Sequence, residues 1–198
     1  MPVTKTEIHP VTPERWGDLA DLFGERGAYD GCWCMFWRVS AKDYSAGRYE
    51  GNRDRLRERV CGHGPPPGVL AYMDGRPVGW CGVAPRDEFG RLQRSRVLGP
   101  VDERPVWSIV CFYVDRGRRR GGVAKRLLQG AIDLAHANGA STLEAYPLDP
   151  QHRVPSSAEA YTGLLPMFRE AGFEVVARRG ATKRPVVRLE LTVNRALP

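Results

Sequence analysis

The residues with the most distinctive chemistry form a basic turn at positions 114–124, Val-Asp-Arg-Gly-Arg-Arg-Arg-Gly-Gly-Val-Ala. An apolar, strand-like run precedes this turn, and an amphipathic, helix-like run follows it. The N-terminus of a helix offers free amides and the positive end of a dipole, and both favour an anion. Gly121 and Gly122 lack the Cβ atoms that would hold a phosphate away from the backbone. The turn therefore predicts an anion site, although a plain glycine turn with solvated arginines would give the same pattern.

A second chemically distinctive segment lies at positions 31–37, Gly-Cys-Trp-Cys-Met-Phe-Trp. Its aromatic rings, Trp33, Phe36 and Trp37, would suit an apolar wall or a cage around a cationic amine. Large aromatic side chains are also common in protein cores, so simple packing is an equal alternative. We treat the three rings as candidate substrate-binding residues.

The chain has five cysteines, an odd number, and this argues for reduced thiols rather than a disulfide framework. The pairs Cys32-x-Cys34 and Cys61-x-His63 together would supply four soft ligands for zinc. The C-x-C spacing is tighter than the usual finger knuckle, and the two pairs lie far apart in the chain. We therefore expect no metal. We also do not assign Cys34 as a covalent acyl carrier, because no histidine neighbours it in the sequence.

The spacing within the basic turn resembles that of a known family. Arg119-x-x-Gly122-x-Ala124 fits the R/Q-x-x-G-x-G/A signature of the GNAT superfamily of acyl-CoA-dependent N-acyltransferases. Two further segments resemble the second-to-third-strand hairpin and the C-terminal helix-to-strand passage of that fold: residues 74–80 and 167–176. The three matches follow the family's order and span much of the chain. The resemblance implies transfer of an acetyl (acyl) group from acetyl-CoA to a primary amine of a small molecule or peptide.

The resemblance also implies roles for particular backbone groups. The edge of the strand from Phe112 to Val114 would pair with pantetheine as an added strand. The Val114 amide would then donate to the thioester oxygen as negative charge develops on it. The family usually builds its acceptor site between the first two helices, where residues 31–37 lie. The coenzyme A pyrophosphate would bind the amides of Arg119, Arg120, Gly121, Gly122, Val123 and Ala124.

Amide formation needs a neutral amine, so a base and an acid for the departing thiolate would assist it. A glutamate on the central strand is often the base in this family, and here Ser108, which could hold a water, takes that position. Phe168 replaces the tyrosine that often serves as acid, and it has no proton to give. Tyr161 on the same predicted helix is our candidate acid, and Glu144 is our candidate base. Glu144 could instead be an exposed carboxylate on a strand without a catalytic role. His152 is another candidate for the acting group, and a mechanism that only positions the two substrates is a further alternative.

The net charge of +7 permits a nucleic-acid-binding protein. The arginines are scattered, however, and no aromatic-plus-basic strip of an RNA-binding module is present, so we expect no nucleic-acid partner. An acyl-CoA-binding regulatory module without turnover is a further alternative, because both usual catalytic positions are changed.

No run of about 18 apolar residues exists, which excludes a helical membrane span. The first ten residues lack a secretory pattern, so we expect a cytoplasmic protein. A homodimer is compatible with the sequence.

The elements that must position these residues alternate between strands and helices, and we expect residues 1–198 to form one domain. The hydrophobic patterns predict strands at 4–11, 68–73, 77–85, 106–115, 141–146, 173–178 and 186–193. They predict helices at 13–23, 52–61, 120–137 and 156–171. Residues 27–49 look irregular, and residues 87–103 are hard to assign. The predicted fold is a single α/β, GNAT-like domain whose mixed, mostly antiparallel sheet of about seven strands is split near Val114 and flanked by helices.

Overall fold

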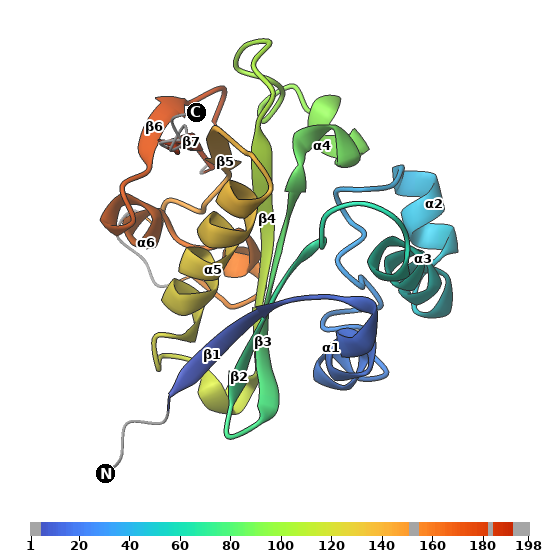
Figure 1. Cartoon of the computed structure of the whole chain (residues 1–198). Coiled ribbons are helices and arrows are strands. Elements are labelled where there is room, and N and C mark those ends of the chain that lie inside the picture. Colours follow the sequence, from blue (N-terminus) through green and yellow to red (C-terminus); the bar gives the residue numbers. More distant parts are fainter. Residues whose placement is uncertain (1–4, 151–154, 182–183, 192–198) are drawn as a thin grey trace, which may run out of the picture.

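The described part of the chain contains a seven-stranded mixed sheet with the strand order β1-β2-β3-β4-β5-β7-β6 (Figure 1). The structure is a computed structural model that describes residues 5–150, 155–181 and 184–191. Every neighbouring pair of strands is antiparallel except β4 and β5, which are parallel. This confirms the predicted fold class. The strands are β1 (Thr6–Pro10), β2 (Gly68–Met73), β3 (Arg76–Pro85), β4 (Trp107–Val114), β5 (Thr142–Ala145), β6 (Glu174–Ala177) and β7 (Val186–Glu190).

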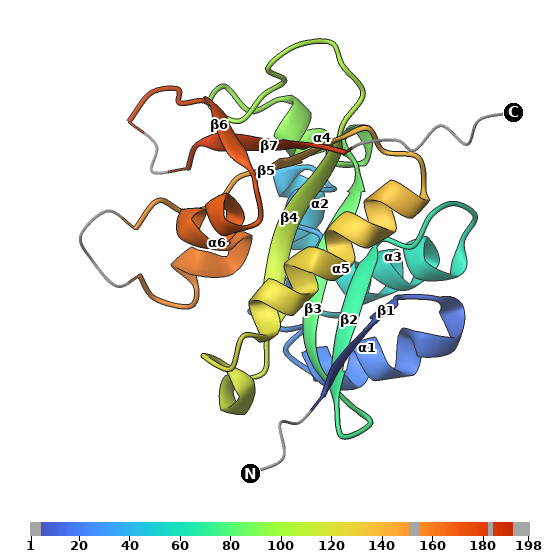
Figure 2. The same ribbon diagram turned by 60° about the vertical axis from the view of Figure 1, so that its left-hand side comes forward.

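Helices cover both faces of this sheet. Helix α5 lies against one face, and α1, α2 and α3 lie beside the opposite face (Figures 1 and 2). The described helices are α1 (Trp16–Phe23), α2 (Ala41–Ala46), α3 (Glu50–Cys61), α4 (Gly90–Gln93), α5 (Val123–Ala137) and α6 (Leu165–Glu170). Short 3₁₀ turns are η1 (Pro13–Arg15), η2 (Arg86–Glu88), η3 (Arg116–Arg118) and η4 (Glu159–Thr162). No helix among the described residues is long and apolar enough to span a membrane.

Helix α5 is held on the sheet by one apolar face. Leu127, Leu128 and Ala131 are fully or almost fully buried, and the helix contacts β1, β2, β3 and β4. Each buried leucine contributes about 1.5–3 kcal/mol through the apolar surface removed from water. Truncating Leu127 to alanine would cost about 2–5 kcal/mol, because the close-packed sheet below cannot fill the space. The packing therefore fixes where the N-terminus of α5 stands.

The predicted hairpin between β2 and β3 is confirmed. Asp74 and Gly75 have φ values of 53° and 72°. Positive φ at both central residues is what a two-residue type I′ turn requires, and Asp-Gly is a preferred sequence for it. The hairpin sets the register of β2 against β3, in which Gly68 lies opposite Gly82. On its other side, Gly82 lies opposite Cys111 of β4.

Two helix predictions need correction. The expected helix 156–171 is two separate elements, η4 and α6, because Gly163 between them has a φ of +80° that interrupts the helix. Helix α2 lies in the segment expected to be irregular, although Ser40 caps it by accepting a hydrogen bond from the Asp43 amide at 3.1 Å. Predicted strand residues 4 and 192–193 lie outside the described residues.

Candidate active site

The central feature of the site is a split between the parallel strands β4 and β5. The two strands pair only from Trp107 opposite Leu143 to Ile109 opposite Ala145. At this point the β3–β4 register also shifts, which leaves Val110 as an extra residue in β4. Such a bulge bends a strand and increases its twist. The strands therefore separate after Ile109, several residues before the predicted position near Val114.

After Ala145 the chain turns away from β4 and joins the segment that precedes α6. The Leu148 amide donates to the Gly163 carbonyl, and the Leu165 amide donates to the Leu148 carbonyl, both at 2.9 Å. The second half of β4 therefore has no described strand paired on its β5 side. An unpaired strand edge is a template for an extended ligand.

The direction of the β4 amides follows from one hydrogen bond. The Asp115 N–H donates to the Val78 carbonyl of β3 at 2.9 Å. Because amides alternate in direction along a strand, the N–H groups of Val114 and Phe112 point the other way, toward the split. These two groups lie on the strand edge, Phe112 to Val114, that the family resemblance implies for pantetheine, and the Val114 amide is the implied donor to the thioester.

The basic turn connects β4 to α5 through η3. The Asp115 carboxylate accepts a hydrogen bond from the Gly117 amide at 2.8 Å, which caps η3. Arg120 and Gly122 have φ values of 65° and 80°. Successive N–H groups in such left-handed turns form concave anion-binding surfaces. A Cβ atom added to Gly122, the N-cap of α5, would meet nothing within 4 Å, so the space before the helix is open. The geometry fits an anion.

The arginines of the turn fall into two groups. Arg119 donates to the Val114 carbonyl at 3.0 Å and to the Ser157 hydroxyl at 2.8 Å, so its side chain braces the turn. Arg116, Arg118 and Arg120 are exposed and form no ion pair with any described residue. The turn therefore combines fixed backbone with three cations that remain available to a multiply charged ligand.

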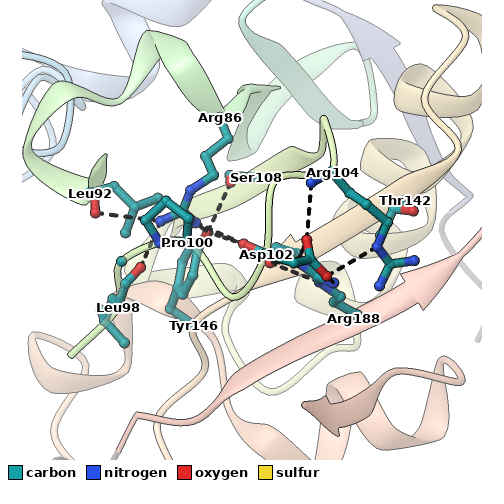
Figure 3. A network of polar contacts seen from close by, with 12 residues as sticks. Arg86, Leu92, Leu98, Pro100, Asp102, Arg104, Ser108, Thr142, Tyr146 and Arg188 are labelled. Carbon is teal, nitrogen blue, oxygen red and sulfur yellow. Dashed lines mark hydrogen bonds and ion pairs between the residues drawn. The ribbon is translucent and has the colours of Figure 1, made fainter. Parts of the chain in front are cut away.

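Ser108 and Glu144 lie at the paired end of β4 and β5, within a buried polar network. Figure 3 shows Ser108 and Tyr146 of this network. The hydroxyl groups of Ser108 and Tyr146 are 2.9 Å apart, and Tyr146 donates to the Glu144 carboxylate, also at 2.9 Å. Burial raises the pKa of Tyr146 well above its ordinary value, with the neighbouring Glu144 charge adding to the effect. Tyr146 therefore stays a neutral donor.

Glu144 is 1% exposed, which overturns the alternative of an exposed strand carboxylate. Arg86 donates to one carboxylate oxygen at 2.7 Å, and the Arg188 Nε donates to the other at 2.8 Å. Arg188 in turn forms a two-point ion pair with Asp102, whose pKa is lowered chiefly by the hydrogen bonds from Arg188. The network fastens β4, β5 and β7 together at the closed end of the split. A base role for Glu144 or Ser108 stays a prediction.

Tyr161 lies in η4, which contacts β4. Its ring is 6.4 Å from the Phe36 ring, and the Arg184 guanidinium lies 5.0 Å over it. Burial raises the pKa of the Tyr161 hydroxyl to about 12. The Arg184 cation lowers this pKa, and the neighbouring Cys111 of β4 raises it further. The break at Gly163 separates Tyr161 from α6, so it does not share a helix with Phe168. It nevertheless lies beside the split.

The three candidate acceptor rings are not equivalent. Trp33 is 3% exposed and packs between Trp16 and Phe23, so it belongs to the core beneath α1. Phe36 and Trp37 are half-buried and meet edge to face with centroids 4.9 Å apart. Only Phe36, among the three, is in ring contact with Tyr161 in the described part of the structure. The structure therefore brings Phe36, and not Trp33, to the candidate site.

Residues 33–155 match the family model described as the acetyltransferase (GNAT) family. The chain belongs to the GNAT acetyltransferase family. No curated protein sequence matches it. Solved structures with a similar fold include an acetyltransferase of the GNAT family from Streptococcus pneumoniae (TM-score 0.55, 14% identity, covering 94% of this chain and 99% of that one). Another is the PaiA N-acetyltransferase of Thermoplasma acidophilum in complex with coenzyme A (TM-score 0.52, 12% identity, 94% and 99%).

Within this GNAT fold, Phe168 has a packing role. It is fully buried, and its ring lies 6.0 Å from Phe112 of β4 and 5.1 Å from Phe173. It thus supports the strand that borders the split without supplying a proton. His152, considered as an acting group from the sequence, lies outside the described residues.

The cysteine pairs do not form the four-ligand site that the zinc alternative requires. Among residues 5–150, 155–181 and 184–191, no group of three or more His, Cys, Asp or Glu side chains is placed to hold a metal ion. Two cavities of about 470 Å³ also lie away from the split, one beside Arg86 and Asp102 and one beside Trp33. Neither is lined by residues 110–114 or by the basic turn.

Arg86, Tyr146 and Arg188, which hold Glu144 in the network, do not follow from the sequence analysis. A charged residue on an otherwise apolar strand is the sequence signal that points to such a buried network. Glu144 and Arg188 occupy paired positions on β5 and β7, and opposite charges favour such cross-strand pairs.

Proposed function

We propose that this GNAT protein transfers an acetyl (acyl) group from acetyl-CoA to a primary amine of a small molecule or peptide, by direct attack of the amine. One observation carries the proposal. The free edge of β4, with the Phe112 and Val114 amides facing the split, leads directly into an open anion-binding turn at the start of α5. This arrangement suits a ligand with an extended amide-containing arm and a pyrophosphate. Coenzyme A, which the T. acidophilum neighbour binds, is such a ligand.

The basic turn would hold the phosphates. The amides from Arg119 to Ala124 and the N-terminus of α5 supply fixed donors for the pyrophosphate. The exposed Arg116, Arg118 and Arg120 supply positive charge around it. The pantetheine arm would then pair with the free edge of β4 from Phe112 to Val114, which directs the thioester into the split.

The chemical step needs few protein groups. The neutral amine attacks the thioester carbonyl carbon and a C–N bond forms. The carbonyl oxygen gains negative charge, which the Val114 amide of β4 would stabilise. The nitrogen of the tetrahedral intermediate then gives up a proton to solvent, the C–S bond breaks as the intermediate collapses to the amide, and the coenzyme thiolate takes up a proton. Tyr161 is the candidate donor of this proton, and its pKa of about 12 means that the hydroxyl is protonated at neutral pH. Holding both substrates together would supply much of the rate.

The acceptor amine would approach along Phe36 and Tyr161, on the face of β4 that carries Cys111. Both rings are partly exposed, and they come from segments far apart in the sequence. Trp37 supports Phe36 from the side. Phe36 therefore provides apolar contact area beside the proposed acid, whereas Trp33 contributes through the core.

Release of free coenzyme A thiol from acetyl-CoA, followed with a panel of primary amines, tests the proposal. We expect thiol release that depends on an amine and yields the N-acetyl product by mass spectrometry. Binding of acetyl-CoA with no amine-dependent release from any acceptor would instead support a regulatory module without turnover. The observations that favour this second function are the phenylalanine at position 168 and the engagement of Ser108 and Glu144 in the buried network.

A further inference from the structure

Two thiols meet on the acceptor side of the sheet. Trp80 donates its indole N–H to the Cys34 sulfur at 3.3 Å. The same sulfur lies 3.1 Å from the position that a Cβ atom on Gly82 would occupy. Gly82 is the direct cross-strand partner of Cys111. Because direct partners carry their side chains on the same face about 5 Å apart, the Cys34 sulfur lies next to the Cys111 thiol.

The backbone around the Cys34 sulfur has two features that let the sulfur lie at this place. A side chain at position 82 would crowd the sulfur, so glycine there leaves room for it. Trp33 and Cys34 have φ values of 42° and 55°, in the left-handed region that non-glycine residues rarely adopt. Two such residues in succession are costly, and strain of this kind concentrates at functional positions.

The two thiols have unequal electrostatic surroundings. A hydrogen bond from Cys111 lowers the pKa of Cys34 against the opposing effect of burial, and Trp80 and the Arg38 cation lower it further. The same hydrogen bond and burial raise the pKa of Cys111 well above its ordinary value. Cys34 is therefore the more readily ionised of the two thiols, and Cys111 is the neighbour that keeps its proton.

We propose that Cys34 and Cys111 form a peroxide-reactive dithiol that is converted to a disulfide. The Cys34 thiolate attacks one oxygen of hydrogen peroxide, the O–O bond breaks, and a sulfenic acid and hydroxide form. Cys111 then attacks the sulfenic sulfur, an S–S bond forms and water leaves. In total, two thiols and one peroxide give one disulfide and two waters, so the thiols are oxidised and the peroxide is reduced.

The other cysteines do not share this arrangement. Cys81 lies on the opposite face of β3 and packs in the core beneath α5. The Cys32 thiol donates to the Gly27 carbonyl, and burial raises its pKa to about 11, so it remains protonated. Cys61 is exposed at the end of α3. The pairing of Cys34 with Cys111 is therefore specific.

A disulfide here would tie residues 31–39 to β4 beside Tyr161, whose pKa responds to both thiols. It would leave the basic turn and the N-terminus of α5 unchanged. This consequence rests on the proposed function: oxidation should slow amine acetylation while acetyl-CoA still binds.

The full-length protein carrying Cys61→Ser, which removes the exposed thiol, is treated with about one equivalent of hydrogen peroxide. Digestion without reduction and fragment-ion mass spectrometry then locate any disulfide. We expect one Cys34–Cys111 link, with fragment ions excluding Cys32. In the Cys111→Ser variant we expect a sulfenic acid on Cys34 that dimedone traps. A different disulfide, or unmodified Cys34 in both proteins, would overturn the proposal.

Calorimetric titration and thiol release separate this inference from the proposed function. We expect the oxidised protein to bind acetyl-CoA with unchanged affinity, to lose at least about 90% of its acetylation rate, and to recover with a thiol reductant. Equal loss of rate in peroxide-treated Cys111→Ser would overturn the role of the disulfide. A protein that forms the disulfide but never binds acetyl-CoA would refute the proposed function and leave the dithiol established.

Discussion

Gly122 and Gly139 flank helix α5 with the same φ of +80°, and a Cβ atom added to either would meet nothing within 4 Å. Gly122 opens the helix beside the split, whereas Gly139 follows it at the far end. The two glycines therefore both need a left-handed backbone conformation, but only Gly122 lies beside the proposed coenzyme site. This makes each a control for the other.

We predict that Gly122→Leu abolishes acetyl-CoA binding and that Gly139→Leu does not. Each change should cost about 1–2 kcal/mol of unfolding free energy, because a left-handed non-glycine residue is strained. Only the leucine at position 122 would occupy the space proposed for the pyrophosphate. Calorimetric titration beside thermal unfolding measures both effects. Equal acetyl-CoA affinity in the two variants would contradict the proposed binding of the coenzyme at the basic turn.

Removing the Tyr161 hydroxyl should slow turnover without weakening coenzyme binding. We expect Tyr161→Phe to lower kcat by about 10²-fold, at the lower end of what general acid catalysis contributes. The ring remains to contact Phe36, so acetyl-CoA affinity should stay within a factor of about two. Tyr29→Phe, at a tyrosine that is 67% exposed, is the matched control. An unaltered kcat in Tyr161→Phe would exclude this hydroxyl as the acid.

The same hydroxyl predicts a pH dependence of stability. Burial raises the folded-state pKa of Tyr161 from the ordinary value of 10.0 to about 12. A raised folded pKa means that the folded protein retains the proton longer than the unfolded chain. Its stabilising contribution is therefore full below about pH 10 and is lost as the pH rises toward 12. Denaturant unfolding between pH 9 and 11 should show a shallower decline for Tyr161→Phe than for the Tyr29→Phe control. Identical slopes would contradict the burial of this hydroxyl.

Breaking the network at Glu144 should destabilise the fold strongly. Glu144→Gln leaves the guanidinium groups of Arg86 and Arg188 without their shared carboxylate, and such losses cost about 3–5 kcal/mol at buried sites. Glu190→Gln on neighbouring β7, whose side chain is 63% exposed, should cost less than about 1 kcal/mol. Chemical denaturation compares the two. A stable Glu144→Gln protein with lost turnover would point instead to a base role for this carboxylate.

Much of the fold is encoded in local patterns. The apolar run of β4, the Asp74-Gly75 turn and the amphipathic face of α5 each lie within one short segment, and each forms as predicted. The break at Gly163 was not predicted, because helix-like residues continue on both sides of the glycine. Helix α2 was missed although Ser40 and Asp43 give a local capping signal.

The candidate site depends on contacts that local patterns do not encode. The Cys34 sulfur lies beside Gly82 of β3, where the absence of a side chain leaves room for it, and the chain arrives there through left-handed residues at Trp33 and Cys34. Likewise, the register of β5 against β7 brings Arg188 to Glu144. These relationships arise from tertiary packing, so the sequence could suggest the residue types but not their partners.

Calorimetric titration of the purified protein with acetyl-CoA, beside desulfo-CoA and longer acyl-CoA analogues, tests the central claim most directly. We predict saturable binding at one site, retained for desulfo-CoA because the pyrophosphate and pantetheine contacts remain, and lost in Gly122→Leu. No binding of any of these ligands at high protein concentration would contradict the claim, because the free edge of β4 and the basic turn would then have no coenzyme to hold.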